Sequence, residues 1–355
     1  MDGKKMPFFD VDGLKEWFLR MRRPLPWRES PSPYAVWISE IMLQQTQASV
    51  VIPYFKKWMQ QFPSILAVAE APLDLLLKSW EGLGYYSRVR HIHQAARFLV
   101  ENHGGKLPSD LEMLAKIKGV GPYTQGAILS FAFHKKAAAV DGNVLRVLAR
   151  YFLIEEELGS ARKKIQGLTE KLLPAEEPWV VMEALIELGA LVCQKKPICQ
   201  ECPLKESCLA HLHKKTERIP LKAKRPASTH LFRSVGIVVC ENKLLVGRVR
   251  GRKVMADLYE FPYVEVASVR DAPKVLQTLI QEDLKIRSRF SFSLSPIQHT
   301  FTRYHATLFP SVWRAEKEVF VQDYEWKTQE ELKSLPFSSG HRQILTGFRN
   351  ADFTH

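Results

Sequence analysis

The chain has 355 residues, 46% hydrophobic and 25% charged, a composition typical of a globular protein long enough for two domains. No uninterrupted apolar run is long enough to cross a bilayer, and the first ten residues lack the apolar core of a secretory signal, so we expect a cytoplasmic protein without membrane contact. The formal net charge of +13 favours a polyanionic partner, of which nucleic acid is the simplest, although charge alone does not separate DNA from RNA or an acidic membrane.

Two halves with different periodicity follow one another along the chain. Up to about Leu212, apolar residues recur at three- and four-residue spacing, as in 73–80, 92–100 and 184–192, which predicts a nearly all-α half. A basic, proline-containing stretch follows. Beyond it come short β-branched or aromatic runs at 234–240, 243–247, 258–262, 291–295 and 306–313, with a helix expected over 272–282. We therefore predict an all-α domain over 1–213, a linker over 214–230, and an α+β domain over 231–355.

Glu40 is the only charged residue in the apolar stretch 34–46, which is expected to form a buried helix. Burial raises the pKa of a carboxyl group, as a general acid working near neutral pH requires. An ion pair with an arginine such as Arg28 is an equally good interpretation of Glu40 taken alone.

The stretch 111–128 predicts a helix, a tight turn and a second helix. Gly119 and Gly121 allow the reversal, and Pro122 suits the first turn of the second helix, where a missing N–H has no cost. Exposed amides at that helix start can approach a phosphate, which favours DNA binding over an ordinary helical hairpin in so basic a chain.

Asp141 stands immediately before a predicted helix, where a carboxylate caps the first turn. Capping and catalysis are compatible, because a rigid, ionised carboxylate can stabilise a positively charged transition state. Two carboxyl groups in different protonation states, Glu40 and Asp141, would suit cleavage of a glycosidic bond.

Four cysteines cluster between Cys193 and Cys208, at intervals of five, two and five residues. In a large chain without a secretory signal such a cluster favours a metal site over disulfides. Zinc and an iron-sulfur cluster both remain open from the chemistry of four thiolates. The four cysteines of this cluster are Cys193, Cys199, Cys202 and Cys208.

Taken together, these motifs resemble the helix-hairpin-helix DNA glycosylases, and specifically the adenine DNA glycosylases of the MutY type. The resemblance covers roughly residues 8–212 and is carried by 25–28, 39–47, 82–88, the hairpin, 140–143 and the cysteine run. It implies one 4Fe-4S cluster on the four cysteines, although the first interval holds five residues where the family usually has six.

The resemblance also implies roles for individual residues. Glu40 would protonate the adenine ring, and Asp141 would stabilise the sugar cation once the base has left the duplex stack. Gln45 and Tyr85 resemble wedges inserted into that stack, Asn143 a positioner of the sugar, and Glu183 a contact to the flipped adenine, with a helix-surface role for Glu183 about equally favoured. The matching motifs supply further expected DNA contacts: Leu25, Trp27, Arg28, Arg88, Gly119 and Gly121.

Tyr123 separates two chemistries. The related endonuclease III lineage has at this hairpin position a lysine that forms a Schiff base and cuts the strand, and a phenol cannot form that imine. The sequence therefore predicts base removal without efficient strand cleavage. Thymine glycosylases that act on T·G mismatches can also have tyrosine there, so Tyr123 does not choose the base.

Residues from about Leu231 resemble, more weakly, the Nudix-like C-terminal domain of the same family. The stretch 271–284 lacks the paired glutamates that a Nudix hydrolase uses to hold divalent metal. The family senses 8-oxoguanine through a Phe-Ser-His turn, and here the matching residues are Phe301, Thr302 and Arg303. We expect 8-oxoguanine to be sensed less selectively, because Arg303 adds a permanent charge for backbone contact.

The expected protein is therefore a monomeric, bacterial-type, nucleoid-associated adenine glycosylase acting on duplex DNA with A·8-oxoguanine or A·G mispairs. A T·G thymine glycosylase and a non-catalytic mismatch-binding protein are the alternatives. A bifunctional pyrimidine glycosylase-lyase explains only the first half and is opposed by Tyr123. A zinc-dependent regulator would need a basic recognition helix, which the sequence does not show.

Overall fold

The computed structural model of the chain describes residues 8–221, 228–248, 255–267, 272–301 and 303–352. Packing divides the chain into a helical unit, Met1–Ala69 with Gln94–Lys224, and a sheet unit, Glu70–His93 with Arg225–His355. The helical periodicity of residues 70–93 gives no sign that they pack with the C-terminal half. Periodicity reports the type of an element and not its packing partner.

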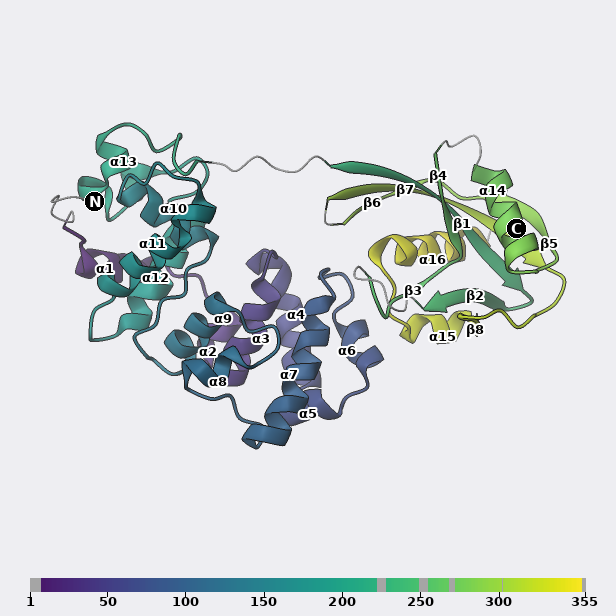
Figure 1. Ribbon diagram of the computed structural model, residues 1–355, viewed down its shortest axis with the longest axis horizontal. Helices are drawn as coiled ribbons and strands as arrows, with labels where there is room; N and C mark the ends of the chain where they lie inside the picture. The colour runs from purple at the N-terminus through teal and green to yellow at the C-terminus, as the bar shows by residue number, and fades with distance from the viewer. Residues whose placement is uncertain (1–7, 222–227, 249–254, 268–271, 302, 353–355) are drawn as a thin grey trace. The chain divides into compact units, whose positions relative to one another are not determined.

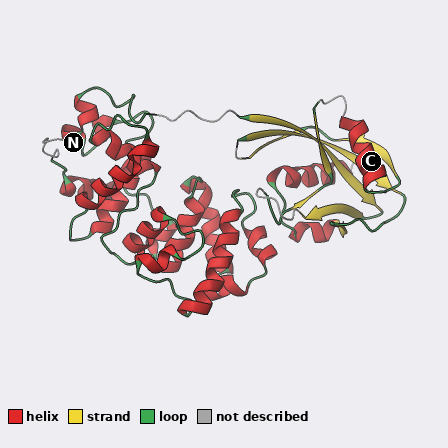
Figure 2. Cartoon of the chain, in the orientation of Figure 1, coloured by secondary structure: helices red, strands yellow, loops and turns green. Residues whose placement is uncertain are grey.

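Short helices build the helical unit (Figure 2). They are α1 (Val11–Met21), α2 (Pro26–Glu29), α3 (Pro33–Leu43), α4 (Ala48–Gln61), α5 (Ile65–Glu70), α8 (Leu111–Ala115), α9 (Pro122–Ala127), α10 (Gly142–Tyr151), α11 (Leu158–Leu172), α12 (Pro178–Leu191) and α13 (Leu209–Leu212). Helix α7 (Ser87–His103) belongs to both units, since its first residues pack with the sheet. A π-helical turn, Ile128–Ala132, continues α9.

Side chains cap the first turns of α3 and α10, the two helices that carry Glu40 and follow Asp141. The Ser32 hydroxyl accepts the Ala35 N–H before α3, and Pro33 occupies the first helical position. The Asp141 carboxylate accepts the Val144 N–H at the start of α10. The core lies where α10 and α12 pack together and α12 meets α1, through the fully buried Leu14, Leu148 and Leu188.

An eight-stranded sheet organises the other unit, with the order β3-β2-β1-β7-β5. Strand β4 pairs with β1, β6 with β7 and β8 with β2. The central β1 and β7 are parallel and the other pairs antiparallel. The strands are β1 (Thr229–Cys240), β2 (Lys243–Arg248), β3 (Tyr259–Glu260), β4 (Tyr263–Val266), β5 (Ser288–Ser293), β6 (Ile297–Phe301), β7 (Tyr304–Ala315) and β8 (Tyr324–Thr328).

Helices cover both faces of this sheet (Figure 1). Helices α15 (Gln329–Ser334) and α16 (Ser339–Asp352) pack against Val235 and Ile237, whereas α14 (Ala272–Thr278) packs against Val238 on the opposite face. Because β1 is buried on both sides, its apolar run is continuous rather than alternating. Helix α6 (Leu73–Ser79) completes the unit.

The predicted order of an all-α half followed by an α+β half is confirmed. The expected helix at 272–282 is α14 extended by a π-helical turn to Asp283, and the strand expected at 291–295 lies earlier, at Ser288–Ser293. None of the helices in the described ranges is both long enough and apolar enough to span a bilayer.

Candidate functional site

A cavity of about 940 Å³ opens in the helical unit, between α2, α3, α9, α10 and α12. Nine of the residues predicted from the sequence line it, drawn from five separate stretches of the chain. They are Leu25, Trp27, Arg28, Glu40, Gln45, Tyr123, Asp141, Asn143 and Glu183. Leu25 and Trp27 are buried, so they form its apolar wall rather than an exposed contact surface.

Glu40 is buried on α3, and its Oε2 accepts a hydrogen bond of 2.7 Å from the Tyr123 hydroxyl. Burial raises the pKa of Glu40 to about 7, with Asp141 and Glu183 adding to the rise and Tyr123 opposing it. At neutral pH a large share of this carboxyl group therefore carries a proton, as a general acid must. Arg28, the partner considered in the sequence analysis, instead forms ion pairs with two other glutamates.

Tyr123 lies in the first turn of α9, immediately after the hairpin. Burial and the neighbouring Glu40 and Asp141 raise the pKa of its phenol well above the ordinary value of 10. The hydroxyl is consequently a permanent hydrogen-bond donor at neutral pH. It holds the Glu40 carboxyl group in place without competing for its proton.

Asp141 accepts two hydrogen bonds of 2.8 Å, one from the Val144 N–H and one from the Asn143 side chain. Burial raises the pKa of Asp141, and these two donors oppose the rise. From the sequence only the capping contact, which favours the ionised form, was expected. Asn143 is held in turn by Arg146, whose Nη2 donates to Asn143 Oδ1 at 2.8 Å and whose Nε donates to the Cys193 carbonyl at 2.7 Å.

Helix α12 reaches this site because Gly189 has no side chain. A Cβ added at Gly189 would lie 2.5 Å from the Cβ of Asn143, closer than real Cβ atoms approach. The glycine therefore lets α12 lie against the start of α10. Glu183, one and a half turns before it, then lines the same cavity as Asp141.

Two arginines and two glutamates form a network at the cavity wall. Arg28 contacts Glu183 at 2.6 Å and Glu187 at 3.1 Å, and Arg23 contacts Glu187 at 2.7 Å. Burial raises the pKa of Glu187, but the hydrogen bonds and charges of both arginines outweigh it and lower this pKa to about 2. Sequence reasoning missed Arg23 and Glu187. The available signal was the i, i+4 spacing of Glu183 and Glu187, which places both on one helix face.

The two expected wedges share a backbone feature, although they belong to different units. Gln45 follows α3 and has a φ of 57°, and Tyr85 lies between α6 and α7 with a φ of 48°. Residues other than glycine seldom adopt these left-handed values, which cost free energy and cluster at functional positions. Tyr85 is 45% exposed, so it is available for contact with another molecule.

The hairpin has the predicted form. Gly119 takes a φ of 81°, a left-handed value that favours glycine, and Gly121 caps α9 with open space where a Cβ would stand. Helix α9 approaches the segment before α10 at Gly126, where an added Cβ would meet the Ala138 carbonyl. The hairpin thus carries Tyr123 to the cavity while leaving the turn exposed.

The four clustered cysteines line one small cavity together with Arg150. Arg150 lies 3.3 Å from the Cys193 sulfur and donates to the carbonyls of Cys193, Gln194 and Lys195. Burial raises the pKa of Cys202 to about 12, opposed by a backbone donor and reinforced by the neighbouring thiols. Within the described ranges, no three His, Cys, Asp or Glu side chains stand close enough to hold a single metal ion.

The turn matched to the opposite-base sensor joins β6 and β7 in the sheet unit. Thr302 lies outside the described residues. Phe301 pairs with Tyr304 across the turn, and the exposed Arg303 stands over the Tyr304 ring at 5.2 Å. The guanidinium of Arg233 lies 5.4 Å from the Phe301 ring centre, so a cation packs on the aromatic ring that precedes the turn.

Comparisons with known proteins fit this geometry. Residues 38–175 match the family model of the HhH-GPD superfamily base excision DNA repair proteins, and residues 234–347 match that of the NUDIX domain. The two matches define the class: a helix-hairpin-helix base excision repair protein with an attached Nudix-like domain.

Two relatives and one solved structure narrow the class. The adenine DNA glycosylase of Buchnera aphidicola subsp. Schizaphis graminum is 30% identical over 84% of this chain and 85% of its own. That of Buchnera aphidicola subsp. Baizongia pistaciae is 42% identical over 57% of this chain and 58% of its own, so the match spans little more than half of that relative. A thermostable thymine-DNA glycosylase has a TM-score of 0.53 and 28% identity, covering 57% of this chain and 95% of that one. The chain belongs to the adenine DNA glycosylase family.

Proposed function

We propose that the chain hydrolyses the N-glycosidic bond of adenine mispaired with 8-oxoguanine or guanine in duplex DNA, acting as a monomer. The observation that carries this proposal is the pairing, in one cavity, of a carboxyl group with a pKa near 7 and a second carboxyl group held by two donors. The cavity is also large enough for a flipped base, since ligand pockets run from about 300 to 1,000 Å³.

In this reaction Glu40 donates its proton to a ring nitrogen of the flipped adenine. The carbon–nitrogen bond then breaks with the electron pair leaving on the base, and Asp141 stabilises the positive charge on the sugar. Water adds to the sugar carbon, and the proton it releases restores the enzyme. Arg28 and Glu183, fixed 2.6 Å apart, present a donor and an acceptor to the base edge.

The proposed chemistry is monofunctional. Tyr123 occupies the hairpin position that carries the imine-forming lysine in the endonuclease III lineage, and its hydroxyl is engaged with Glu40. The product is therefore an intact strand with an abasic site, cut only by added alkali.

We further propose that the cysteine loop holds a 4Fe-4S cluster. Four thiols on one cavity suit thiolate ligation of several irons, and Arg150 beside Cys193 offsets the negative charge of such a group. Its ligands would be Cys193, Cys199, Cys202 and Cys208. When bound, the cluster would supply a rigid support for the loop, while the chemistry of base removal rests on residues of the helical unit. Metal analysis that finds zinc in place of iron would overturn this assignment.

The sheet unit, with the predicted domain 231–355 as its largest part, would sense the opposite base. Within the proposed linker 214–230, Ile219 is buried in the helical core, and Thr229 and His230 belong to β1. Phe301 and Arg303 support this sensing role, because an aromatic ring and a guanidinium at one turn suit a base face and a phosphate. Thr302, which lies between them, would contribute a hydroxyl. We expect weaker discrimination of 8-oxoguanine from guanine than in relatives with a Phe-Ser-His turn.

Single-turnover excision tests the whole proposal, on duplexes with A·8-oxoguanine, A·G, A·T and T·G pairs, each with and without alkali. The wild type should give alkali-dependent cutting at A opposite 8-oxoguanine, and Glu40→Gln should abolish it. Cutting at T·G instead would move the chain to thymine chemistry, which the structural likeness to a thymine-DNA glycosylase keeps as the second candidate. Binding without cutting would indicate a mismatch-binding protein.

A further inference from the structure

Residues 80–88 form a compact loop with an exposed aromatic tip. Three of its residues take left-handed backbone conformations, Gly82 at φ 101°, Gly84 at φ 71° and Tyr85 at φ 48°. Glycine adopts such values at no steric cost, but Tyr85 does not, and its left-handed conformation persists only where the surroundings over-determine it. The loop therefore needs anchors, and the structure shows two sets of them.

The first set lies within the loop. The Arg88 guanidinium is buried, donates to the carbonyls of Leu83 and Gly84, and stacks between the Trp80 and Tyr85 rings at 5.2 and 5.6 Å. The Trp80 indole also donates to the Gly84 carbonyl at 3.1 Å. Arg88 therefore stabilises the loop from within, whereas from the sequence it was expected only to contact DNA.

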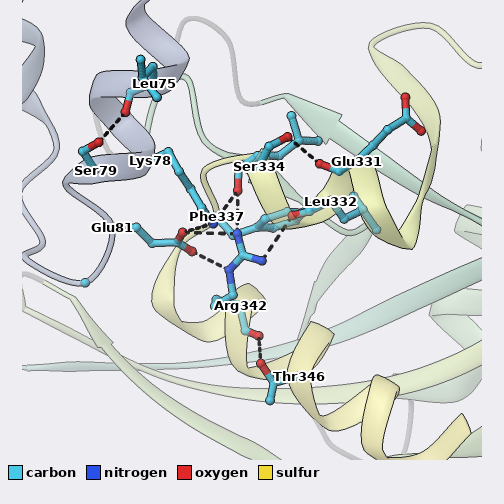
Figure 3. A network of polar contacts seen from close by, with 12 residues as sticks. Leu75, Lys78, Ser79, Glu81, Glu331, Leu332, Ser334, Phe337, Arg342 and Thr346 are labelled. Atoms are coloured by element: carbon cyan, nitrogen blue, oxygen red, sulfur yellow. Dashed lines mark hydrogen bonds and ion pairs between the residues drawn. The ribbon is translucent and has the colours of Figure 1, made fainter. Parts of the chain in front are cut away.

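The second set comes from the C-terminal part of the sheet unit (Figure 3). Arg342 of α16 grips the Glu81 carboxylate with two nitrogens, at 2.6 and 3.2 Å. The guanidinium of Arg342 also donates to the carbonyls of Leu332 and Leu335 at the end of α15, and it lies over the Phe337 ring. The Glu81 side chain is only 14% exposed, so water screens this pair weakly.

Tyr86 adds a second contact on the other side of the loop tip. Its hydroxyl donates to the Phe337 carbonyl at 3.3 Å and accepts the Gly82 N–H at 3.4 Å. Glu81 and Tyr86 therefore flank the segment 82–85, and both are contacted by residues from one stretch, 332–342; Glu81 is also paired with Lys78 at 2.6 Å. The exposed Tyr85 ring is the part of this arrangement left facing outward.

We infer that residues 332–342 of the C-terminal domain hold the loop 80–88 in the conformation that inserts Tyr85 into DNA, with Glu81 and Arg342 as positioning residues for mispair recognition. The inference rests on the proposed function, with the wedge role of Tyr85 taken from the family resemblance of the sequence. From the sequence, the C-terminal domain was expected only to sense the opposite base. By this inference it also holds Tyr85, a wedge residue from the first half of the chain, in position.

Charge reversal and its repair test the inference in the full-length protein. Glu81→Arg should weaken binding of A·8-oxoguanine duplex about tenfold, equivalent to about 1.4 kcal/mol, because a half-buried bidentate pair becomes a repulsion. Adding Arg342→Glu in the same chain should recover most of the affinity. A 2-aminopurine placed beside the 8-oxoguanine reports insertion directly: its fluorescence should rise with wild type, and rise little with Tyr85→Ala or Glu81→Arg.

Asp74→Asn is the matched control. It removes another ion pair between the same two parts of the sheet unit, that of Asp74 with Arg248, but away from the loop. It should leave the 2-aminopurine signal unchanged, whereas a merely structural role for Glu81 would make the two variants alike. Glu81→Gln, which keeps the volume of the side chain, serves if Glu81→Arg does not fold, and it should still lower the signal.

The inference is overturned if Glu81→Arg gives the same rise in 2-aminopurine fluorescence as the wild type. It is also overturned if the double variant recovers none of the lost DNA affinity. Failure of the proposed function is seen separately, in the excision assay. If the wild type acts on T·G, the same series is measured on that mispair. A wild type that raises the 2-aminopurine signal at no mispair in the panel overturns the inference outright.

Discussion

Glu40 is protonated in the folded protein at pH values where the unfolded chain has released the proton. Its pKa rises from 4.5 to about 7 on folding, chiefly through burial. Because the folded pKa is the higher one, the contribution of this group to stability is fully present below pH 4.5. It is lost as the pH rises through 7. A shift of about 2.5 units, from 4.5 to 7, corresponds to about 3 kcal/mol at 1.36 kcal/mol per unit.

Glu40→Gln removes the titration while keeping the shape of the side chain. The amide oxygen can still accept the hydrogen bond from Tyr123, so the contact seen at 2.7 Å is preserved. We expect the variant to match the wild type within about 1 kcal/mol at pH 5 and to be about 3 kcal/mol more stable at pH 8. Urea unfolding followed by far-ultraviolet circular dichroism at both pH values measures this difference.

Glu330→Gln is the control, because Glu330 is exposed and lies on α15 in the other unit. Its effect should be small and the same at both pH values. An equal stability difference between wild type and Glu40→Gln at pH 5 and pH 8 would refute the raised pKa. Glu40 would then not hold a proton at neutral pH, as a general acid must.

Three further outcomes follow from the site. Tyr123→Phe removes a hydrogen-bond donor that favours the ionised form of Glu40, so the pKa of Glu40 should rise. The pH dependence of the single-turnover rate measures this pKa, and an unchanged or lower value would contradict the contact. Gly189→Ala should destabilise the protein by about 1–3 kcal/mol and slow excision, because the added methyl group displaces Asn143; thermal unfolding and single-turnover rates that match the wild type would count against it. Glu187→Gln removes the charge partner of Arg23 and leaves Arg28 with Glu183 alone, so it should lower the free energy of unfolding by about 3 kcal/mol at pH 7. The difference from wild type should shrink as the pH falls toward 2, and urea unfolding over this range measures it. A difference independent of pH would show that packing, not charge, is responsible.

Much of the site could be predicted from local sequence, because its residues sit at positions with local signals. Asp141 precedes a helix and caps it, and Gly119 stands where a turn requires a left-handed residue. Glu40 is conspicuous as a single charge in an apolar helix that the structure buries along most of its length. Each of these signals depends on neighbours within a few residues, which a sequence displays directly.

The contacts that the sequence did not display join residues far apart in the chain. The partner of Glu40 turned out to be Tyr123, and the ion pairs of Arg28 go to Glu183 and Glu187, more than 150 positions away. Likewise β4, β6 and β8 were missed because short strands at the sheet periphery carry weak periodicity. Long-range pairing is decided by packing, and no local pattern encodes it.

The sheet unit is discontinuous in sequence, and this has a consequence for synthesis on the ribosome. Asp74 and Glu81 meet partners 174 and 261 residues further along the chain. The segment Glu70–His93 is therefore translated long before the surface on which it packs, and chains generally fold from the N-terminus as they emerge. That face of the segment stays uncovered until Arg342 has been synthesised, so the sheet unit is completed only then and not when the linker leaves the ribosome.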